Sequence, residues 1–330
     1  NQLREELREP RESQEVGVLV ADCYFLNEDY SSAADAYRAV LREVSPDFAQ
    51  EVFFQLVVSE IRAGRVGEAG QEIDNAFADP NIETVTLWRA EWNLLDHLRK
   101  DGRVEQAFDR LQEHFRREGP GAAVPPTLHL RMRWLLARLL FEADRNTEAQ
   151  ERCNQLLEDL GSTRYASIPD ALIQEVESHL LLLKGEILFA EDAAEQALEV
   201  FASLRQAFPD SGPTILSYLV ESRSESGEEN LVSAERSLVD LVDRFPESEY
   251  APIALWEAAL TAEQRGLNTH LQEAISRLER LVTEYPEHSL VYFARLKQGD
   301  LARRLNDFPT ALLLYERLLA LYPGHPERFR

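Results

Sequence analysis

An alanine and an aromatic-proline pair recur together along the second half of this 330-residue chain. The pair occurs four times, and its prolines lie 37, 40 and 37 residues apart. An alanine lies twelve residues before each proline, and a leucine lies five residues before it. The positions are Ala197, Leu204 and Pro209; Ala234, Leu241 and Pro246; Ala274, Leu281 and Pro286; and Ala311, Leu318 and Pro323. A repeat of this length predicts a stack of similar small units instead of one central core.

The spacing within one unit is helical. Ala311, Tyr315, Leu318 and Tyr322 lie at i, i+4, i+7 and i+11, which places them on one stripe of a helix. The alanine is small enough to let a neighbouring helix cross at close range. The proline ends the helix, because it has no N–H to donate and restricts the residue before it. A further helix around Gly299 precedes this one, so each unit is predicted to be a helical hairpin.

These residues resemble the tetratricopeptide repeat, a unit of about 34 residues. That family has a small residue in the first helix, alanine early in the second, an aromatic residue or leucine one turn later, and then proline. The last unit matches with Gly299, Ala311, Tyr315 and Pro323, and the fifth with Gly185, Ala197, Phe201 and Pro209. Towards the N-terminus the same alanine falls at Ala33, Ala69, Ala107 and Ala149. The resemblance implies an all-α, right-handed superhelical solenoid of about eight helical hairpins.

The repeat register also predicts how the chain is divided. One segment, residues 119–126, is dense in glycine and proline, and we expect a loop or hinge there. The predicted parts are an N-terminal flanking segment at 1–14, units one to three at 15–118, the loop at 119–126, units four to eight at 127–325, and a C-terminal end at 326–330.

The composition excludes several classes of function. The chain has 35 basic and 59 acidic side chains, a formal net charge of −24. An acidic surface repels phosphate backbones and anionic lipids, so we expect no nucleic-acid partner. No apolar run is long enough to cross a bilayer, so we expect no direct membrane insertion. Cys23 and Cys153 are too few for a disulfide framework and are expected to be buried thiols.

No catalytic or metal-binding motif occurs in the sequence. We therefore expect a protein that is not an enzyme, with no catalytic residues, no cofactor and no metal.

The candidate binding residues lie on the first helices of units two to four. Arg89 and Trp92 hold the same register positions in unit three that Arg131 and Trp134 hold in unit four. The full candidate set is Phe54, Arg89, Trp92, Arg131, Trp134, Arg138 and Phe141, with Trp256 at the tryptophan position of unit seven. The resemblance implies that this face lines a concave groove that binds extended peptides or helices. The alternative is that Trp92 and Trp134 only pack against the adjacent repeat, with arginine stems covering them.

Two functions of different classes follow. The first is a non-enzymatic scaffold that binds a protein or peptide in the groove, through basic or carboxylate-bearing segments of the partner. The second is a structural spacer or oligomerisation element in a larger chain or a cell-envelope complex. On the last helix Leu313, Leu314, Leu319 and Leu321 exceed what one buried stripe requires, which predicts end-to-end self-association.

The junction Phe245 to Pro252 is loosely similar to bacterial envelope proteins of the same family, of the Tol-Pal coordinator and outer-membrane assembly lipoprotein type. It favours a periplasmic or envelope-associated location over a cytoplasmic one.

Overall fold

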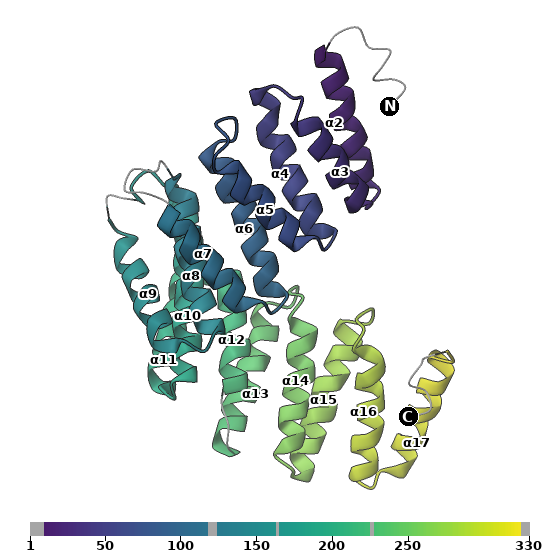
Figure 1. The fold of residues 1–330 in the computed structure, drawn as a ribbon. Helices are drawn as coiled ribbons and strands as arrows, with labels where there is room; N and C mark the ends of the chain where they lie inside the picture. Colours follow the sequence, from purple (N-terminus) through teal and green to yellow (C-terminus); the bar gives the residue numbers. More distant parts are fainter. Residues whose placement is uncertain (1–9, 118–123, 163–164, 225–227, 325–330) are drawn as a thin grey trace. The chain divides into compact units, whose positions relative to one another are not determined.

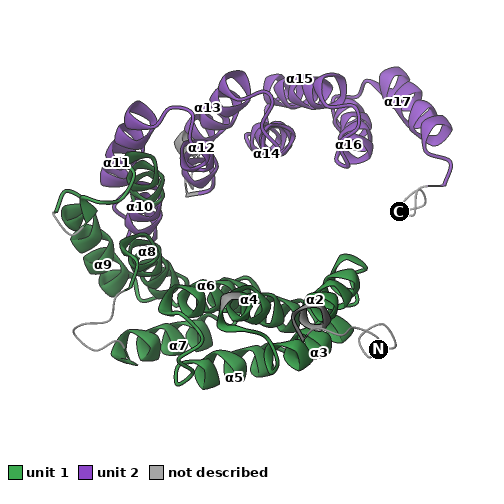
Figure 2. Ribbon diagram, turned by 90° about the horizontal axis from the view of Figure 1, so that it is seen from above, with its two compact units in different colours: residues 1–180 green, residues 181–330 purple. Residues whose placement is uncertain are grey.

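The structure is a computed structural model that describes residues 10–117, 124–162, 165–224 and 228–324. Within these residues every regular element is an α-helix, from α2 to α17, and none is a strand (Figure 1). The chain divides into two compact units, Asn1–Leu180 and Leu181–Arg330, and the division falls within α10, Asp170–Ala190 (Figure 2). The two units are described separately below.

Unit 1 holds four hairpins and the start of a fifth. Its helices are α2 (Pro10–Leu26) and α3 (Tyr30–Leu41), α4 (Pro46–Arg62) and α5 (Val66–Ala76), α6 (Thr84–Lys100) and α7 (Val104–Arg117), α8 (Pro126–Glu142) and α9 (Asn146–Asp159), then the first part of α10. Unit 2 holds the rest of α10 with α11 (Ala194–Ala207), then α12 (Gly212–Ser224) and α13 (Glu228–Arg244), α14 (Ala251–Gln264) and α15 (Asn268–Glu284), α16 (Val291–Arg304) and α17 (Phe308–Leu321).

The prediction of an all-α solenoid of about eight hairpins is confirmed, because the sixteen described helices form eight successive pairs. Helix α2 begins at Pro10, so the last five residues of the predicted flanking segment at 1–14 belong to it. Most of the predicted loop at 119–126 lies outside the described residues, which resume at 124. The hinge there stays a prediction.

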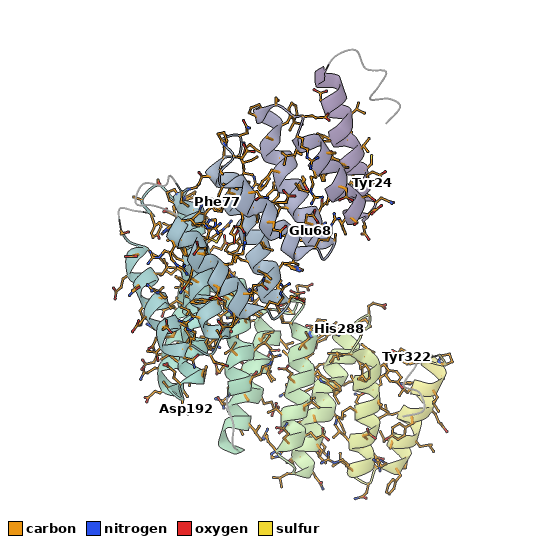
Figure 3. The ribbon with its side chains drawn as sticks, viewed as in Figure 1. Tyr24, Glu68, Phe77, Asp192, His288 and Tyr322 are labelled. Atoms are coloured by element: carbon orange, nitrogen blue, oxygen red, sulfur yellow. The ribbon has the colours of Figure 1, made fainter. Side chains whose placement is uncertain are left out.

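The turn inside a hairpin is closed by a residue with left-handed backbone. In the second hairpin this residue is Gly64, with φ 76°. The N–H of Arg65 then donates to the carbonyl of Glu60 at 2.9 Å, and the carbonyl of Arg65 accepts from Ala69 at 3.0 Å. The first helix thus ends in a Schellman-type turn, and the repeat alanine lies in the first turn of the second helix. Equivalent left-handed residues are Glu28, Gly102, Asp144, Asp192 and Asn306, of which Asp192 is labelled in Figure 3.

The small residue of the first helix makes room for an aromatic ring of the second. A Cβ added to Gly185 would lie 2.1 Å from Cε1 of Phe201, and one added to Gly299 would lie 2.5 Å from Cε1 of Tyr315. Phe201 is fully buried, so its ring has no free space into which to move. The glycine and aromatic positions that the resemblance singled out are therefore in direct contact.

The two cysteines differ. Cys153 is fully buried, and its thiol donates to the carbonyl of Leu180 at 3.3 Å. Cys23 is exposed on α2, so the expectation that it is buried is wrong. The reason is that α2 is the first of the described helices, so no described hairpin precedes it in the way that α14 and α15 precede α16, where the corresponding Leu301 is buried. Within the described part of the chain, no helix is long and apolar enough to cross a membrane.

Replacing Gly185 with alanine is expected to lower the urea midpoint of unfolding. The added methyl group must displace the Phe201 ring in a closed core, and overpacking of this kind costs about 1–3 kcal/mol. Gly67→Ala on α5 is the matched control, because a Cβ there meets nothing within 4 Å. Helix propensity predicts that the control gains about 0.5–1 kcal/mol. Equal midpoints for the two variants would contradict the packing argument.

Candidate functional site

The first helices of successive hairpins lie side by side in unit 1. Helix α6 contacts both α4 and α8, and in Figure 2 these three helices form one layer, with α5 and α7 in another. We call the exposed side chains of α4, α6, α8 and the start of α10 the first-helix row. All seven predicted binding residues lie on α4, α6 and α8.

Three rings in the row contact one another. Trp92 on α6 and Trp134 on α8 have ring centroids 6.2 Å apart, with planes tilted by 31°. His179 on α10 meets Trp134 edge-on at 5.6 Å. Trp92 and Trp134 are half-buried, so each packs against its neighbour and still presents part of its ring to solvent. The buried indole nitrogen of Trp134 has no hydrogen-bond partner within the described residues.

Arg89 lies at the same part of the row. Its guanidinium carbon is 4.4 Å from the centroid of the Phe54 ring, so the arginine covers Phe54 on α4 and not Trp92 on its own helix. The side chain is exposed, and no carboxylate of the described residues lies within ion-pair distance of it. Arg89 therefore carries a positive charge that the described protein leaves available.

The positive charge of Arg131 is compensated only weakly, by one carboxylate of α10. Its guanidinium is 3.5 Å from the carboxylate of Glu175 on α10, and about half of each side chain is exposed. An exposed pair of this kind contributes about 0–1 kcal/mol, so a ligand carboxylate can replace Glu175 at little cost.

Arg138 and Phe141 are held differently, near the C-terminal end of α8. Arg138 pairs with Glu142 at 2.6 Å, and its guanidinium carbon is 5.6 Å from the Phe141 ring. Glu142 also pairs with Arg99 at 3.0 Å. These two predicted residues belong to an ion-pair network within the protein and are not grouped with Trp92 and Trp134.

Sequence reasoning missed Glu175 and His179, which join the row from the start of α10. The sequence contains a signal for both, because they lie on the first helix of the fifth hairpin, as the other candidates lie on the first helices of earlier hairpins. The long interval between Ala149 and Ala197 makes it hard to assign the register positions of Glu175 and His179. The alternative interpretation expects arginine stems to cover the tryptophans, whereas Arg89 covers the ring of Phe54.

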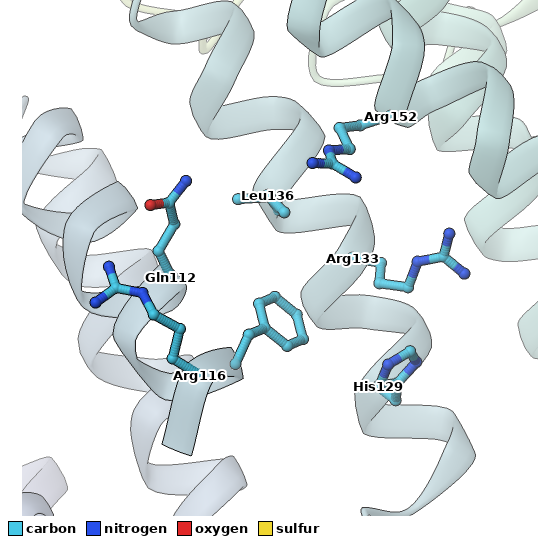
Figure 4. Close-up of a pocket in the computed structure, with 7 residues that line it drawn as sticks. Gln112, Arg116, His129, Arg133, Leu136 and Arg152 are labelled. Atoms are coloured by element: carbon cyan, nitrogen blue, oxygen red, sulfur yellow. The ribbon is translucent and has the colours of Figure 1, made fainter. Parts of the chain in front are cut away.

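A pocket of about 370 Å³ lies between α7, α8 and α9, and it is shown in Figure 4. Phe115 and Leu136 supply its apolar surface, and Arg116, Arg133 and Arg152 supply positive charge. Two of these charges are already compensated. Arg116 pairs with Glu113 at 2.6 Å, and Arg133 pairs with Asp159 at 2.6 Å and donates to the hydroxyl of Tyr165 at 3.0 Å. The pocket is thus a weaker candidate for an anionic ligand than its arginines suggest.

A second cavity, of about 300 Å³, lies beside a buried acidic group, Glu91. Burial raises the pKa of Glu91, although Arg110 at 2.7 Å opposes that shift. His114 is buried 4.0 Å from Glu91 and meets the Trp88 ring edge-on at 4.4 Å. Burial, helped by the charges of Arg110 and Arg117, lowers the pKa of His114 to about 4. The imidazole is therefore neutral at neutral pH and packs as part of the core.

No group of three or more metal-ligating side chains occurs in the described parts of the chain.

Comparisons with known proteins identify the repeat. A family model described as a tetratricopeptide repeat matches residues 268–326, which contain α15, α16 and α17. No curated protein sequence matches the chain. A signal transduction ATPase with numerous domains and a tetratricopeptide repeat sensor, from Pyrococcus horikoshii, has a TM-score of 0.55 at 13% identity. The match covers 97% of this chain and 48% of that one, so this chain spans about half of its length.

Two Rap proteins have similar folds. The apo form of RapI has a TM-score of 0.51 at 9% identity, over 84% of this chain and 78% of that one. A Rap protein complexed with Competence and Sporulation Factor has a TM-score of 0.50 at 10% identity, over 96% and 99%. At these identities the likeness concerns the fold. The family match identifies tetratricopeptide repeats at residues 268–326, and the described chain as a whole has the same kind of fold, a stack of helical hairpins.

Because His114 is buried and neutral, we expect the free energy of unfolding to decrease as the pH is lowered from 6.5 to 4. Its pKa is 6.5 in an unfolded chain and about 4 here, so as pH falls between these values only the unfolded chain takes up the proton. The slope reaches about 1.4 kcal/mol per pH unit. The raised pKa of Glu91 acts in the opposite direction, and it remains in a His114→Leu variant.

Urea unfolding of wild type and His114→Leu at a series of pH values measures the difference in slope. We expect the variant to lose much less stability between pH 6.5 and 4 than the wild type does. Any constant loss of packing shifts both ends equally and leaves the slope unaffected. Parallel curves for the two proteins would show that His114 is protonated in the folded chain.

Proposed function

We propose that this chain is a non-enzymatic interaction scaffold and that the first-helix row binds an extended or helical segment of another protein. The observation that carries the proposal is the half-exposed ring pair of Trp92 and Trp134, with the uncompensated Arg89 beside it. Tryptophan and arginine are the residue types that most often dominate the binding energy of an interface.

The mechanism is reversible docking. Apolar side chains of the ligand cover the exposed parts of the two indole rings, which removes apolar area from water at about 25 cal/mol per Å². A ligand carboxylate then pairs with Arg89. A second can take the place of Glu175 on Arg131, since that pair is long and exposed. Burial of the apolar contact excludes water from the ion pair and strengthens it.

The chain's net charge of −24 adds a long-range preference. It attracts ligands with basic segments and repels acidic ones until they are close. The ligand class that fits best is therefore a segment with an apolar anchor and one carboxylate for Arg89, flanked by basic residues.

The fold comparisons support a binding role without identifying the ligand. One structurally similar protein is a Rap protein complexed with Competence and Sporulation Factor, and another has a tetratricopeptide repeat sensor. Hairpin stacks of this kind present long surfaces that suit segment binding.

The bacterial, envelope-associated location stays a prediction from the proline junctions. Fractionation of the source cells tests it, with the protein expected in the periplasmic or membrane fraction.

Peptides selected from a random display library against the intact protein provide ligands for a direct test. We expect Arg89→Ala and Trp92→Ala each to raise the dissociation constant of the selected peptides about tenfold or more, as truncation of an interface anchor does. Fluorescence anisotropy with a labelled peptide measures the dissociation constant, and circular dichroism checks that each variant is folded. Lowering the salt concentration is expected to tighten binding of peptides with basic flanks.

Trp256→Ala is the matched control. Trp256 lies on α14 at the register position of Trp92 and is also half-buried, but it belongs to unit 2. The Trp256→Ala variant is expected to bind the same peptides with the affinity of the wild type. The proposal fails if the selected peptides bind the Arg89 and Trp92 variants as tightly as they bind the wild type.

A further inference from the structure

A cavity of about 530 Å³ lies in unit 2, where two successive junctions between hairpins come together. Most of its lining belongs to the α13–α14 junction and the start of α14, between residues 246 and 253. The rest is Tyr285 and His288 of the α15–α16 junction, and His288 is labelled in Figure 3. The cavity therefore lies within the stack and not on a helix at either end of the described chain.

Rigid rings supply much of the lining. Tyr250 and Tyr285 are half-buried, and both pack against the apolar core of unit 2 while part of each ring lines the cavity. Pro246 is exposed, and Pro252 is buried in the first turn of α14. Such side chains have little conformational freedom to lose when a ligand packs on them. The cavity thus offers apolar contact at a low cost in entropy.

Hydrogen bonds hold this lining in place. The hydroxyl of Tyr285 donates to the carbonyl of Pro246 at 2.8 Å, which ties one junction to the next. Within the α13–α14 junction, the N–H of Tyr250 donates to Oγ of Ser248 at 3.2 Å, and the N–H of Ala251 donates to the carbonyl of Ser248 at 3.0 Å. A ligand therefore meets a preformed surface, which favours binding because little needs to be ordered.

The polar part of the lining is acidic. Glu247 and Glu249 are exposed, and no cation of the described residues lies within ion-pair distance of either. Burial raises the pKa of the Tyr285 hydroxyl, and the carboxylates of Glu284 and Glu247 raise it further, although Arg280 opposes them. Negative charge is thus concentrated beside the rings, and it attracts a cationic group of a ligand.

The neighbouring junctions lack this combination of side chains. Counting from the aromatic-proline pair, Glu249 and Tyr250 correspond to Ser289 and Leu290 at the α15–α16 junction. The α11–α12 junction has glycine and proline at the same two positions. The repeat therefore folds without a carboxylate and a tyrosine at these positions, so the turn itself does not require them. Both side chains are available for contact with a ligand.

We propose that this cavity binds an extended segment of another protein in which proline lies next to arginine or lysine. Grooves lined by aromatic rings bind proline-rich segments, which are already extended in the polyproline II conformation. The prolines of the ligand pack on the rings of Tyr250 and Tyr285, and its cation pairs with Glu247 or Glu249. The net charge of −24 favours the approach of a basic segment over an acidic one. This site is separate from the first-helix row.

A short labelled peptide in which pairs of prolines alternate with single arginines tests the proposal. Fluorescence anisotropy measures its dissociation constant for the intact protein. Two further peptides are measured beside it, one with glutamate for each arginine and one with serine for each proline. We expect the arginine-proline peptide to bind, and each of the other two to bind about tenfold more weakly or worse. Added salt is expected to weaken binding of the arginine-proline peptide.

Two variants each remove one half of the site. Glu247→Gln/Glu249→Gln removes the charges, and Tyr250→Leu introduces the residue type of the next junction, so circular dichroism is expected to match the wild type. Each variant is expected to raise the dissociation constant of the arginine-proline peptide about tenfold. Glu195→Gln/Glu199→Gln is the matched control, because both side chains are exposed on α11 and do not line the cavity. It makes the same change in net charge and is expected to retain the affinity of the wild type.

The proposal is overturned if the wild type does not bind the arginine-proline peptide, or binds the glutamate or serine peptide equally well. Unchanged affinity of the Glu247→Gln/Glu249→Gln variant would place the contact elsewhere. Loss of binding in Trp92→Ala would place it in the first-helix row, whereas we expect that variant to bind this peptide like the wild type. Each of these failures leaves the test with library-selected peptides unaffected, so the two binding sites stand or fall separately.

Discussion

A helical hairpin in this chain can bury its apolar stripe only against the hairpins before and after it. Val282 on α15 is covered because α16 follows, and Ala302 on α16 is covered because α15 precedes. The turn fixes this relation, since the left-handed residue ends the first helix and places the repeat alanine in the first turn of the second. Stability in such a stack is shared between neighbours, so the placement of the first-helix row follows from this packing rule.

The sequence predicts the parts of the structure that depend on residue size. Alanine and glycine mark close approach, and Gly185 lies against Phe201 as the register requires. The exposure of a residue depends in addition on which neighbours exist, and this explains the error at Cys23. Its register position, Leu301, is buried in α16 beneath the preceding hairpin, whereas no described helix precedes α2. The seven candidate residues were placed on the correct layer of helices, but their partners Glu175 and His179 depend on how α10 meets α8.

Charge pairing was the least predictable feature. Glu60 and Glu91 are fully buried on α4 and α6, and each is compensated by arginine from a second helix or its turn. Arg110 is 2.7 Å from Glu91, and Arg65 is 2.5 Å from Glu60. Burying a carboxylate is costly unless a cation and hydrogen bonds accompany it, and the planar guanidinium provides both. A list of charged residues shows no such pairing, because it depends on which faces of two helices meet.

This pairing separates Arg89 from Arg138, which the sequence analysis places in the same candidate set. Arg138 has a carboxylate within reach, Glu142 at 2.6 Å, and no described carboxylate pairs with Arg89. Arg89 instead lies over Phe54, where the ring attracts the cation without neutralising it.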